Sequence, residues 1–469
     1  MLLELTLTKP NSLTRPSLQF CGLLVALLAL FLMGGSSRLD VQSLAILNPV
    51  TVFCCGVALL TLRQGHWRDQ KFWFAGFALL FLLVAFYLAP FSAALDAMSQ
   101  RGDNVAILRN YAILPNASTA LSIMPSATWQ SFFFLFAPLA VFLFAMQLTR
   151  VELNLTLPIE ISIGAVSGVF GVLQLAGGTE GSLYLYRITN NGSAVGLFAN
   201  RNHAAVLLAC LFPILAVFAT RSRGIRSGVS NMQQLIAMSV AILLVPLILV
   251  TGSRAGMLAS IIGMIGGAVL YGSQISASNL QKKDGSRTFI LVATVLLCLV
   301  FATIYFSRAE AIERLFADNS TVNSRAEFWT SSVNLFWNYF PFGFGPGSFV
   351  PAFQNDEPIA LLNHSYLNRL HNDWLETWLT FGVPGILLML SGVVYYARRS
   401  FLLWFRMDGR RSAVVLGRLA SIIIAILGVA SMSDYPLRTP AMMGLAAVVL
   451  LWFAEARREP KVTAGNPDQ

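Results

Sequence analysis

Apolar residues form long runs along most of this chain, and short polar segments separate the runs. Each run is close to the roughly 20 residues that an α-helix needs to cross about 30 Å of hydrocarbon. Because backbone polar groups inside a bilayer must be satisfied within the segment itself, these runs predict helices. About twelve spans fit this pattern, at residues 18–35, 41–62, 72–90, 129–148, 157–177, 203–220, 232–251, 254–272, 288–306, 384–405, 413–433 and 439–455. The sequence therefore predicts an all-α, polytopic integral membrane protein with a single membrane domain over residues 1–469.

The composition agrees with this prediction and leaves little material for a separate soluble domain. The chain is 56% hydrophobic and only 12% charged, whereas a soluble domain of this length exposes far more charge. The first apolar run, from Phe20 to Met33, is followed by no clear cleavage site, so we expect an uncleaved first helix. We expect the tail at 459–469 to be disordered and cytoplasmic.

Basic residues are distributed unevenly between the two sets of loops. With both termini on the cytoplasmic side, 21 of the 32 basic residues lie in cytoplasmic segments, as the positive-inside rule requires. The other 11 are on the outer side, and all of them are arginine, which suits bidentate contact with phosphate or carboxylate. The net charge of +10 is thus explained by topology, and no sequence motif indicates a nucleic-acid partner.

The largest segment between spans, residues 307–383, is predicted to be a periplasmic loop that contains short helices. A capping box at Ser324–Glu327 precedes aromatic residues at helical spacing, which predicts an amphipathic helix at about 325–340 against the membrane surface. Glycines make 343–349 a turn-rich stretch without the lysine of a phosphate-binding loop. A second short helix at about 371–381 should end at the Gly382–Gly385 break.

Charged residues are nearly missing from the middles of the predicted spans. Ion-coupled transporters normally carry acids or broken polar helices near the midplane. Any active region should therefore lie at the outer membrane boundary, where the unusual polar residues gather.

Three polar groups stand at predicted helix starts on that side. Arg254 lies in a short Gly- and Ser-containing connection, where it can bind an anion at a helix N-terminus or act as a snorkelling anchor; we favour anion binding. Arg201 and His203 can bind substrate or simply belong to a polar helix start. Arg325, in the first turn of the amphipathic helix, would on spacing alone be an ordinary surface arginine.

His371 opens the second short helix and is one of only four histidines. A single histidine is most often structural, but His371 is adjacent to Asn372 and Asp373, with Glu376 one turn on, at the arginine-rich boundary. This setting favours a general base. His364, His371 and Asp373 match no established metal-site spacing, and neither do the five cysteines, so we predict no metal and no cofactor.

Four motifs in order give the chain a resemblance to a known family. They are Gly252–Gly256, Ser324–Trp329, Gly343–Phe349 and His371–Glu376, the last leading to the Gly382–Gly385 break. Over about residues 190–400 the chain resembles the O-antigen ligase and O-antigen polymerase-like membrane glycosyltransferases, and the number of predicted spans fits along the full length.

The resemblance implies an enzyme of cell-surface polysaccharide assembly, making O-antigen or exopolysaccharide, in the bacterial inner membrane, with its active site on the periplasmic side. Its donor would be an undecaprenyl-pyrophosphate-linked glycan, and its acceptor a hydroxyl on a glycan, on lipid A-core or on a protein. It implies that Arg254 and Arg325 contact the pyrophosphate and that His371 is the base. Arg201, His203, Asn372 and Glu376 would bind substrate. Ligase, polymerase and protein glycosyltransferase remain alternatives within the family.

The chemistry of glycosyl transfer fits these residue types. Negative charge grows on the departing pyrophosphate, and without a metal fixed guanidinium groups must stabilise it. Two other classes remain: a transporter or flippase of the same lipid-linked glycan, or a non-catalytic subunit of an envelope complex. A flippase would need an internal polar pathway, and a subunit would tolerate substitution of the outer arginines and His371.

Overall fold

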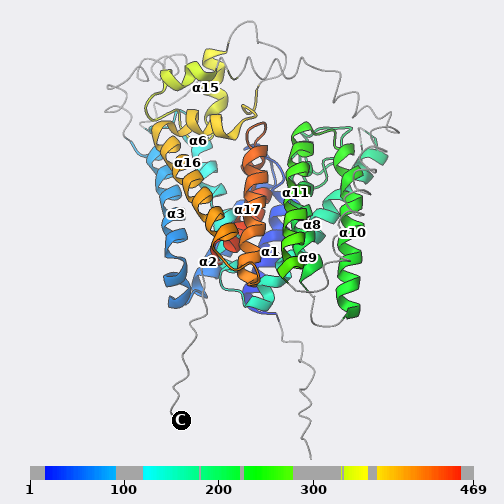
Figure 1. Cartoon of the computed structure of the whole chain (residues 1–469). Helices are drawn as coiled ribbons and strands as arrows, with labels where there is room; N and C mark the ends of the chain where they lie inside the picture. The colour runs from blue at the N-terminus through cyan, green and yellow to red at the C-terminus, as the bar shows by residue number, and fades with distance from the viewer. Residues whose placement is uncertain are drawn as a thin grey trace, which may run out of the picture.

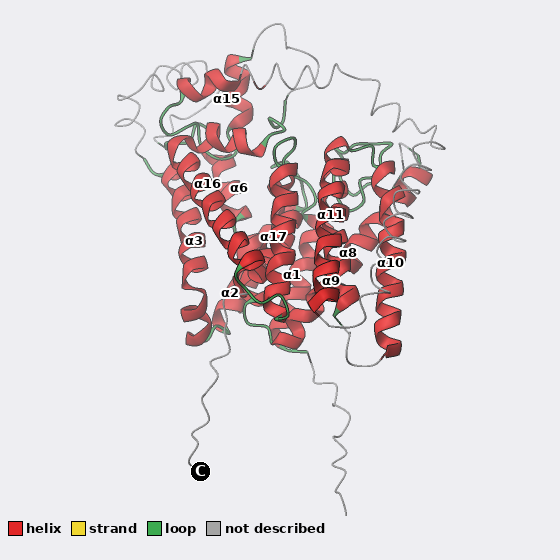
Figure 2. Ribbon diagram, in the orientation of Figure 1, coloured by secondary structure: helices red, strands yellow, loops and turns green. Residues whose placement is uncertain are grey.

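The computed structural model describes residues 16–90, 120–178, 181–221, 227–277, 329, 332–357 and 367–455. These residues form an all-helical bundle and contain no strand (Figure 1, Figure 2). A smaller layer that includes α15 lies across one end of the bundle, and we call this end the α15 end.

The described helices differ in length, and so do the connections between them. Their bounds are α1 Leu18–Met33, α2 Leu44–Leu60, α3 Gln64–Leu88, α6 Pro125–Phe134, α7 Phe136–Ala145, α8 Arg150–Ala176, α9 Arg201–Thr220, α10 Ser227–Val250, α11 Arg254–Ala277, α15 Phe349–Asp356, α16 Asp373–Phe405, α17 Ser412–Ala430, the 3₁₀ turn η2 Pro436–Arg438 and α18 Pro440–Glu455.

Most predicted spans coincide with these helices. Among the described residues, eight segments are long and apolar enough to cross a membrane, with α6 and α7 together forming one of them, and α1, α2 and α18 are shorter apolar helices. These elements account for every predicted span except 288–306, which lies outside the described residues. The all-helical, multi-pass architecture is confirmed, and the total of twelve spans stays a prediction.

The α9 helix is the central helix of the bundle, with 83% of its most apolar stretch buried. The α11 helix packs against it through glycines at four-residue spacing. A Cβ on Gly263 would lie 2.5 Å from the carbonyl oxygen of Ala209, and a Cβ on Gly267 would lie 3.1 Å from that of Phe212. Small residues at this spacing let two helix backbones approach closely, and α9 is the partner.

One acid does lie inside a span. Glu160 in α8 is fully buried, and neither of its carboxylate oxygens has a hydrogen-bond partner within the described part of the chain. Glu160 is the clearest exception to the expectation that the interiors of the spans hold almost no ionisable groups.

The layer at the α15 end has a small hydrophobic core of its own. Tyr339, Phe344, Phe349 and Phe353 are buried there together with Leu379 of α16. Gly343, Gly345 and Gly347 adopt positive φ values of 74°, 95° and 81°, which only glycine adopts readily, so the predicted turn chemistry is confirmed. Of the predicted 325–340 helix, residues 332–338 are helical, and its first turn lies outside the described residues.

The α16 helix begins in this layer and continues through the bundle. It is interrupted at Gly382, whose φ of 56° and ψ of −141° are not helical. The backbone N–H of Val383 donates to the carbonyl of Pro341 at 2.8 Å instead of to its own helix. The predicted break is therefore present, and it divides α16 into a short segment in the α15 layer and a long apolar span.

Candidate active site

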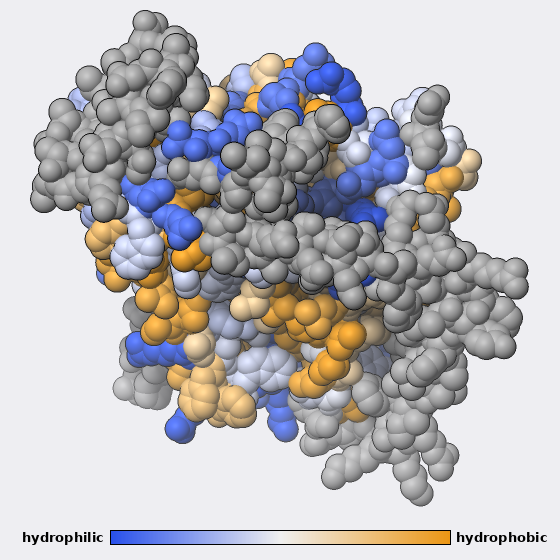
Figure 3. All heavy atoms as spheres, turned by 90° about the horizontal axis from the view of Figure 1, so that it is seen from above, coloured by the Kyte–Doolittle hydropathy of each residue, from blue (hydrophilic) through white to orange (hydrophobic). Residues whose placement is uncertain are grey.

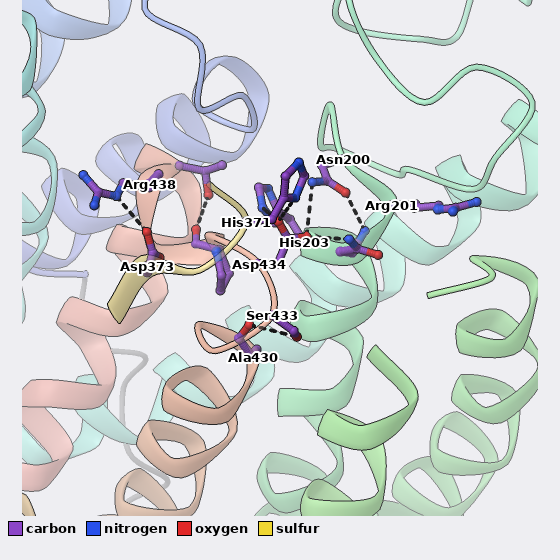
Figure 4. Close-up of polar contacts among 12 residues, drawn as sticks. Asn200, Arg201, His203, His371, Asp373, Ala430, Ser433, Asp434 and Arg438 are labelled. Carbon is purple, nitrogen blue, oxygen red and sulfur yellow. Dashed lines mark hydrogen bonds and ion pairs between the residues drawn. The ribbon is translucent and has the colours of Figure 1, made fainter. Parts of the chain in front are cut away.

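The connection between α17 and α18 places a buried carboxylate at the α15 end of the bundle. Asp434 is buried, and its backbone N–H donates to the carbonyl of Ala430 at the end of α17 (3.0 Å). Its Oδ1 lies 3.1 Å from Nδ1 of His371, 63 residues earlier in the chain (Figure 4). The fold thus builds an imidazole–carboxylate pair from two distant segments.

Two asparagines at the start of α9 bind the other oxygen of the same carboxylate. Asn200 Nδ2 donates to Asp434 Oδ2 at 3.3 Å, and Asn202 Nδ2 also donates to it. Burial alone would raise the pKa of Asp434, but the hydrogen bond with His371, the charge interaction with His203 and the Asn202 contact lower it to about 2. Asp434 is therefore ionised at neutral pH.

The backbone of His371 is held in an uncommon conformation. Its φ is 56°, in the left-handed region that costs free energy for residues with a side chain, although histidine is among the more tolerant. The preceding residue is fixed from both sides: Leu370 N–H donates to Glu376 Oε2 (3.1 Å), and its carbonyl accepts from Trp329 Nε1 (3.0 Å). The α15 layer therefore helps to set the position of the imidazole.

Four charged side chains form a second cluster next to this pair. Arg438 Nε lies 2.7 Å from Asp373 Oδ1, Arg369 Nη1 lies 2.9 Å from Glu376 Oε1, and Arg438 Nη2 lies 3.8 Å from the same Glu376 oxygen. Burial alone would lower the pKa of Arg438, but the carboxylates of Glu376 and Asp373 raise it. Two cations and two anions balance here, and the cluster fastens η2 to the first turn of α16.

Asn372 and Glu376 have contacts that position the chain. The Asn372 side chain caps α16 by accepting from Leu375 N–H (3.0 Å), and the side chain of Glu376, only 1% exposed, binds Arg369 and Leu370. Direct contact of Asn372 or Glu376 with a substrate remains a prediction.

Arg201 and Arg254 are the first residues of α9 and α11. A Cβ on Gly256 would lie 2.2 Å from Cβ of Ala205, so the first turns of the two helices pack together at the α15 end. Arg254 is exposed, and Arg201 extends away from Asp434 (Figure 4). Figure 3, viewed from this end, shows hydrophilic surface toward the middle of the face.

The turn before α11 explains how Arg254 is presented. Gly252 has a φ of 62°, and buried Ser253 accepts from the backbone N–H of Gly256 at 2.9 Å as the N-cap. Arg254 therefore projects from the first turn of a helix, as predicted from the sequence. Arg325 lies outside the described residues, so its contact with a donor stays a prediction.

His203 is a second, buried imidazole near Asp434. Its Nε2 is 4.0 Å from Asp434 Oδ1, and its side chain is 1% exposed. The structure thus brings two of the predicted site residues, His203 and His371, to one carboxylate.

Sequence reasoning missed Asp434, which is the centre of this arrangement. Asp434 and Arg438 are the only charged residues between Arg418 and Glu455. An acid and an arginine in one short turn between two apolar runs are the signal that could have drawn attention to this connection.

These features define a class: a multi-pass helical membrane protein with a histidine–carboxylate pair and arginines at helix starts on one end. Residues 239–390 match the family model described as O-Antigen ligase. The match confirms the resemblance to the O-antigen ligase and polymerase-like family, and it extends from α10 into α16, including Arg254 and His371. No curated protein matches the chain significantly.

The family indicates a role in polysaccharide assembly as a glycosyltransferase-like enzyme, with a lipid-linked glycan and an acceptor as partners. Arg201, His203 and Asp434 lie outside the matched segment, and their place in the site comes from the contacts described above.

Proposed function

We propose that this protein is a metal-independent membrane glycosyltransferase. It transfers a glycan from an undecaprenyl-pyrophosphate-linked donor to an acceptor hydroxyl at the periplasmic face of the inner membrane. The observation that carries the proposal is the hydrogen-bonded pair of His371 and ionised Asp434 at the end of the bundle where α9 and α11 begin with arginines.

The pair fixes which nitrogen of His371 acts as the base. Because Asp434 is ionised, it can only accept, so the proton of neutral His371 lies on Nδ1 and faces the carboxylate. Nε2 then has a lone pair for the acceptor hydroxyl. As this hydroxyl attacks, its proton moves to Nε2, and Asp434 stabilises the imidazolium that forms.

Two helix starts at the α15 end favour one side for the donor. Arg201 and Arg254 belong to the first turns of long helices, where the helix dipole also favours an anion. We therefore place the pyrophosphate beside α9 and α11.

The reaction balances with these groups alone. The bond between the anomeric carbon and the pyrophosphate oxygen breaks, and the acceptor oxygen forms the new bond to that carbon. The proton goes to His371, and the undecaprenyl pyrophosphate departs with the negative charge that the arginines stabilise. The lipid tail of the donor requires a site level with the head groups, which a site at the end of the bundle provides.

Purified protein in detergent, with a lipid-linked glycan and an acceptor, tests the proposal. Wild type should form a new glycosidic bond detected by mass spectrometry, and excess EDTA should not reduce the rate. His371→Ala and Arg254→Ala should each lower the rate by about 10²–10⁴-fold. The matched control is Arg187→Ala, which removes an exposed arginine from the connection between α8 and α9.

Each outcome separates the alternatives. Bond formation in detergent, with no second compartment, identifies a transferase and not a flippase. Wild-type rates in His371→Ala or Arg254→Ala would contradict the assigned roles. In cells that lack the protein, capped single repeat units on the lipid carrier indicate a polymerase, and complete polymer on the carrier indicates a ligase.

A further inference from the structure

His203 is a buried imidazole that takes no direct part in the proposed base catalysis by His371. It lies in the first turn of α9 and is 1% exposed, and neither ring nitrogen has a hydrogen-bond partner among the described residues. A buried polar group without a partner costs free energy, so its retention calls for an explanation.

The geometry of Asp434 suggests one. Oδ1 of Asp434 faces both imidazoles: His371 Nδ1 at 3.1 Å and His203 Nε2 at 4.0 Å. The ring of Tyr435 contacts both, with its centroid 5.1 Å from that of His203 and 4.9 Å from that of His371. The two histidines are therefore coupled through one carboxylate and one aromatic ring.

The other groups that face this carboxylate are neutral or already balanced. Asn200 and Asn202 donate to Oδ2. Burial raises the pKa of Tyr435, so its hydroxyl stays neutral, and Arg369 and Glu376 beyond it are paired with each other. The single negative charge of Asp434 is thus shared mainly between His371 and the groups that donate toward it.

We propose that His203 is a positioning residue whose neutral imidazole directs an N–H dipole toward Asp434 Oδ1 and so sets how strongly Asp434 attracts the proton on His371. The inference rests on the proposed role of His371 as base. At 4.0 Å the interaction is longer than a hydrogen bond and acts as a dipole on the carboxylate, but inside the protein it is weakly screened. Each donor on Asp434 weakens its attraction for the proton on His371.

Two substitutions distinguish this role from simple packing. His203→Phe keeps an aromatic ring against Tyr435 and Phe198 but removes the donor. Asp434 should then attract the proton on His371 more strongly, and the acid limb of the rate–pH profile should move up by about 0.5 pH unit or more. His203→Gln keeps an N–H donor, so its acid limb should stay close to that of wild type.

A residue that only fills space would give the opposite order, with His203→Phe the better replacement and neither acid limb displaced. Phe198→Leu, which alters the packing around His203 and leaves Asp434 untouched, is the matched control and should not move the limb. His203→Leu replaces His203→Phe if the latter fails to insert, with the same upward shift expected.

Transfer rates of the purified wild type and variants, measured between pH 5 and 9, test the role proposed for His203. Superimposable profiles for wild type and the apolar variant would overturn the inference, even where wild type is an active transferase. Lack of transfer by wild type at every pH would instead contradict the proposed function.

Discussion

At the residue scale, one ionised side chain organises the site. Asp434 accepts from His371 and from two asparagines of α9, and its pKa falls to about 2 because these contacts outweigh its burial. A buried carboxylate with this many donors stabilises the fold only while it is charged.

Acid should therefore weaken the fold through Asp434. Its pKa is about 2 in the folded protein and about 3.9 in an unfolded chain. The contribution is complete above pH 4 and is lost as the pH falls through 2. Asp434→Asn lacks this contribution, so wild type should exceed the variant in thermal stability at pH 6, and the difference should shrink toward pH 2.

Thermal unfolding in detergent measures the difference in stability, with Asp408→Asn as an exposed control. A difference that grows on acidification would contradict this role of Asp434.

The sequence identified the individual residues better than their partners. Arg254 could be placed at a helix start because a glycine turn and a serine cap precede it, and both are local signals. The pairing of His371 with Asp434 spans 63 residues, and that of Asn202 with Asp434 spans 232. Such contacts depend on how helices pack, which the spacing of residues in one chain does not encode.

At the element scale, the approach of α11 to α9 sets the distance between the two arginine-bearing helix starts. Gly263 and Gly267 permit the close contact, and their four-residue spacing is a local pattern typical of a packed helix face. The identity of the partner helix could not be predicted, because several apolar helices present similar faces.

Two glycines of α11 allow a matched test. In Gly263→Ala the new Cβ would lie 2.5 Å from the carbonyl oxygen of Ala209, whereas in Gly272→Ala it would meet nothing within 4 Å. We expect Gly263→Ala to lose about 1–3 kcal/mol of stability and Gly272→Ala to be neutral or to gain up to about 1 kcal/mol. Thermal unfolding monitored by size-exclusion chromatography compares them, and equal stabilities would show that the contact is not tight.

At the scale of the whole molecule, the fold gathers its polar chemistry at the α15 end. The connection between α1 and α2 belongs to this end, because the carbonyl of Ser37 accepts from Arg369 (3.2 Å). The turn between α16 and α17, which holds Arg410, lies at the opposite end. The charge bias of the loops predicts that the first end faces the periplasm.

Cysteine labelling tests this orientation. In a background without the native cysteines, Asp40→Cys should react with a membrane-impermeant maleimide in intact cells, since the side chain of Asp40 is 56% exposed. Arg410 is also exposed, and Arg410→Cys should react only after the membrane is permeabilised. The reverse pattern would place the site in the cytoplasm and contradict the proposed reaction.

The position of Asp434 also has a consequence for biosynthesis. Helices enter the membrane in chain order, and the carboxylate that completes the pair with His371 arrives only with the connection between α17 and α18. A nascent chain that has already inserted α9, α11 and most of α16 still has an imidazole without its acid. Activity should therefore begin only when the last helix pair is in place, so that truncated products of interrupted synthesis cannot consume the lipid-linked donor.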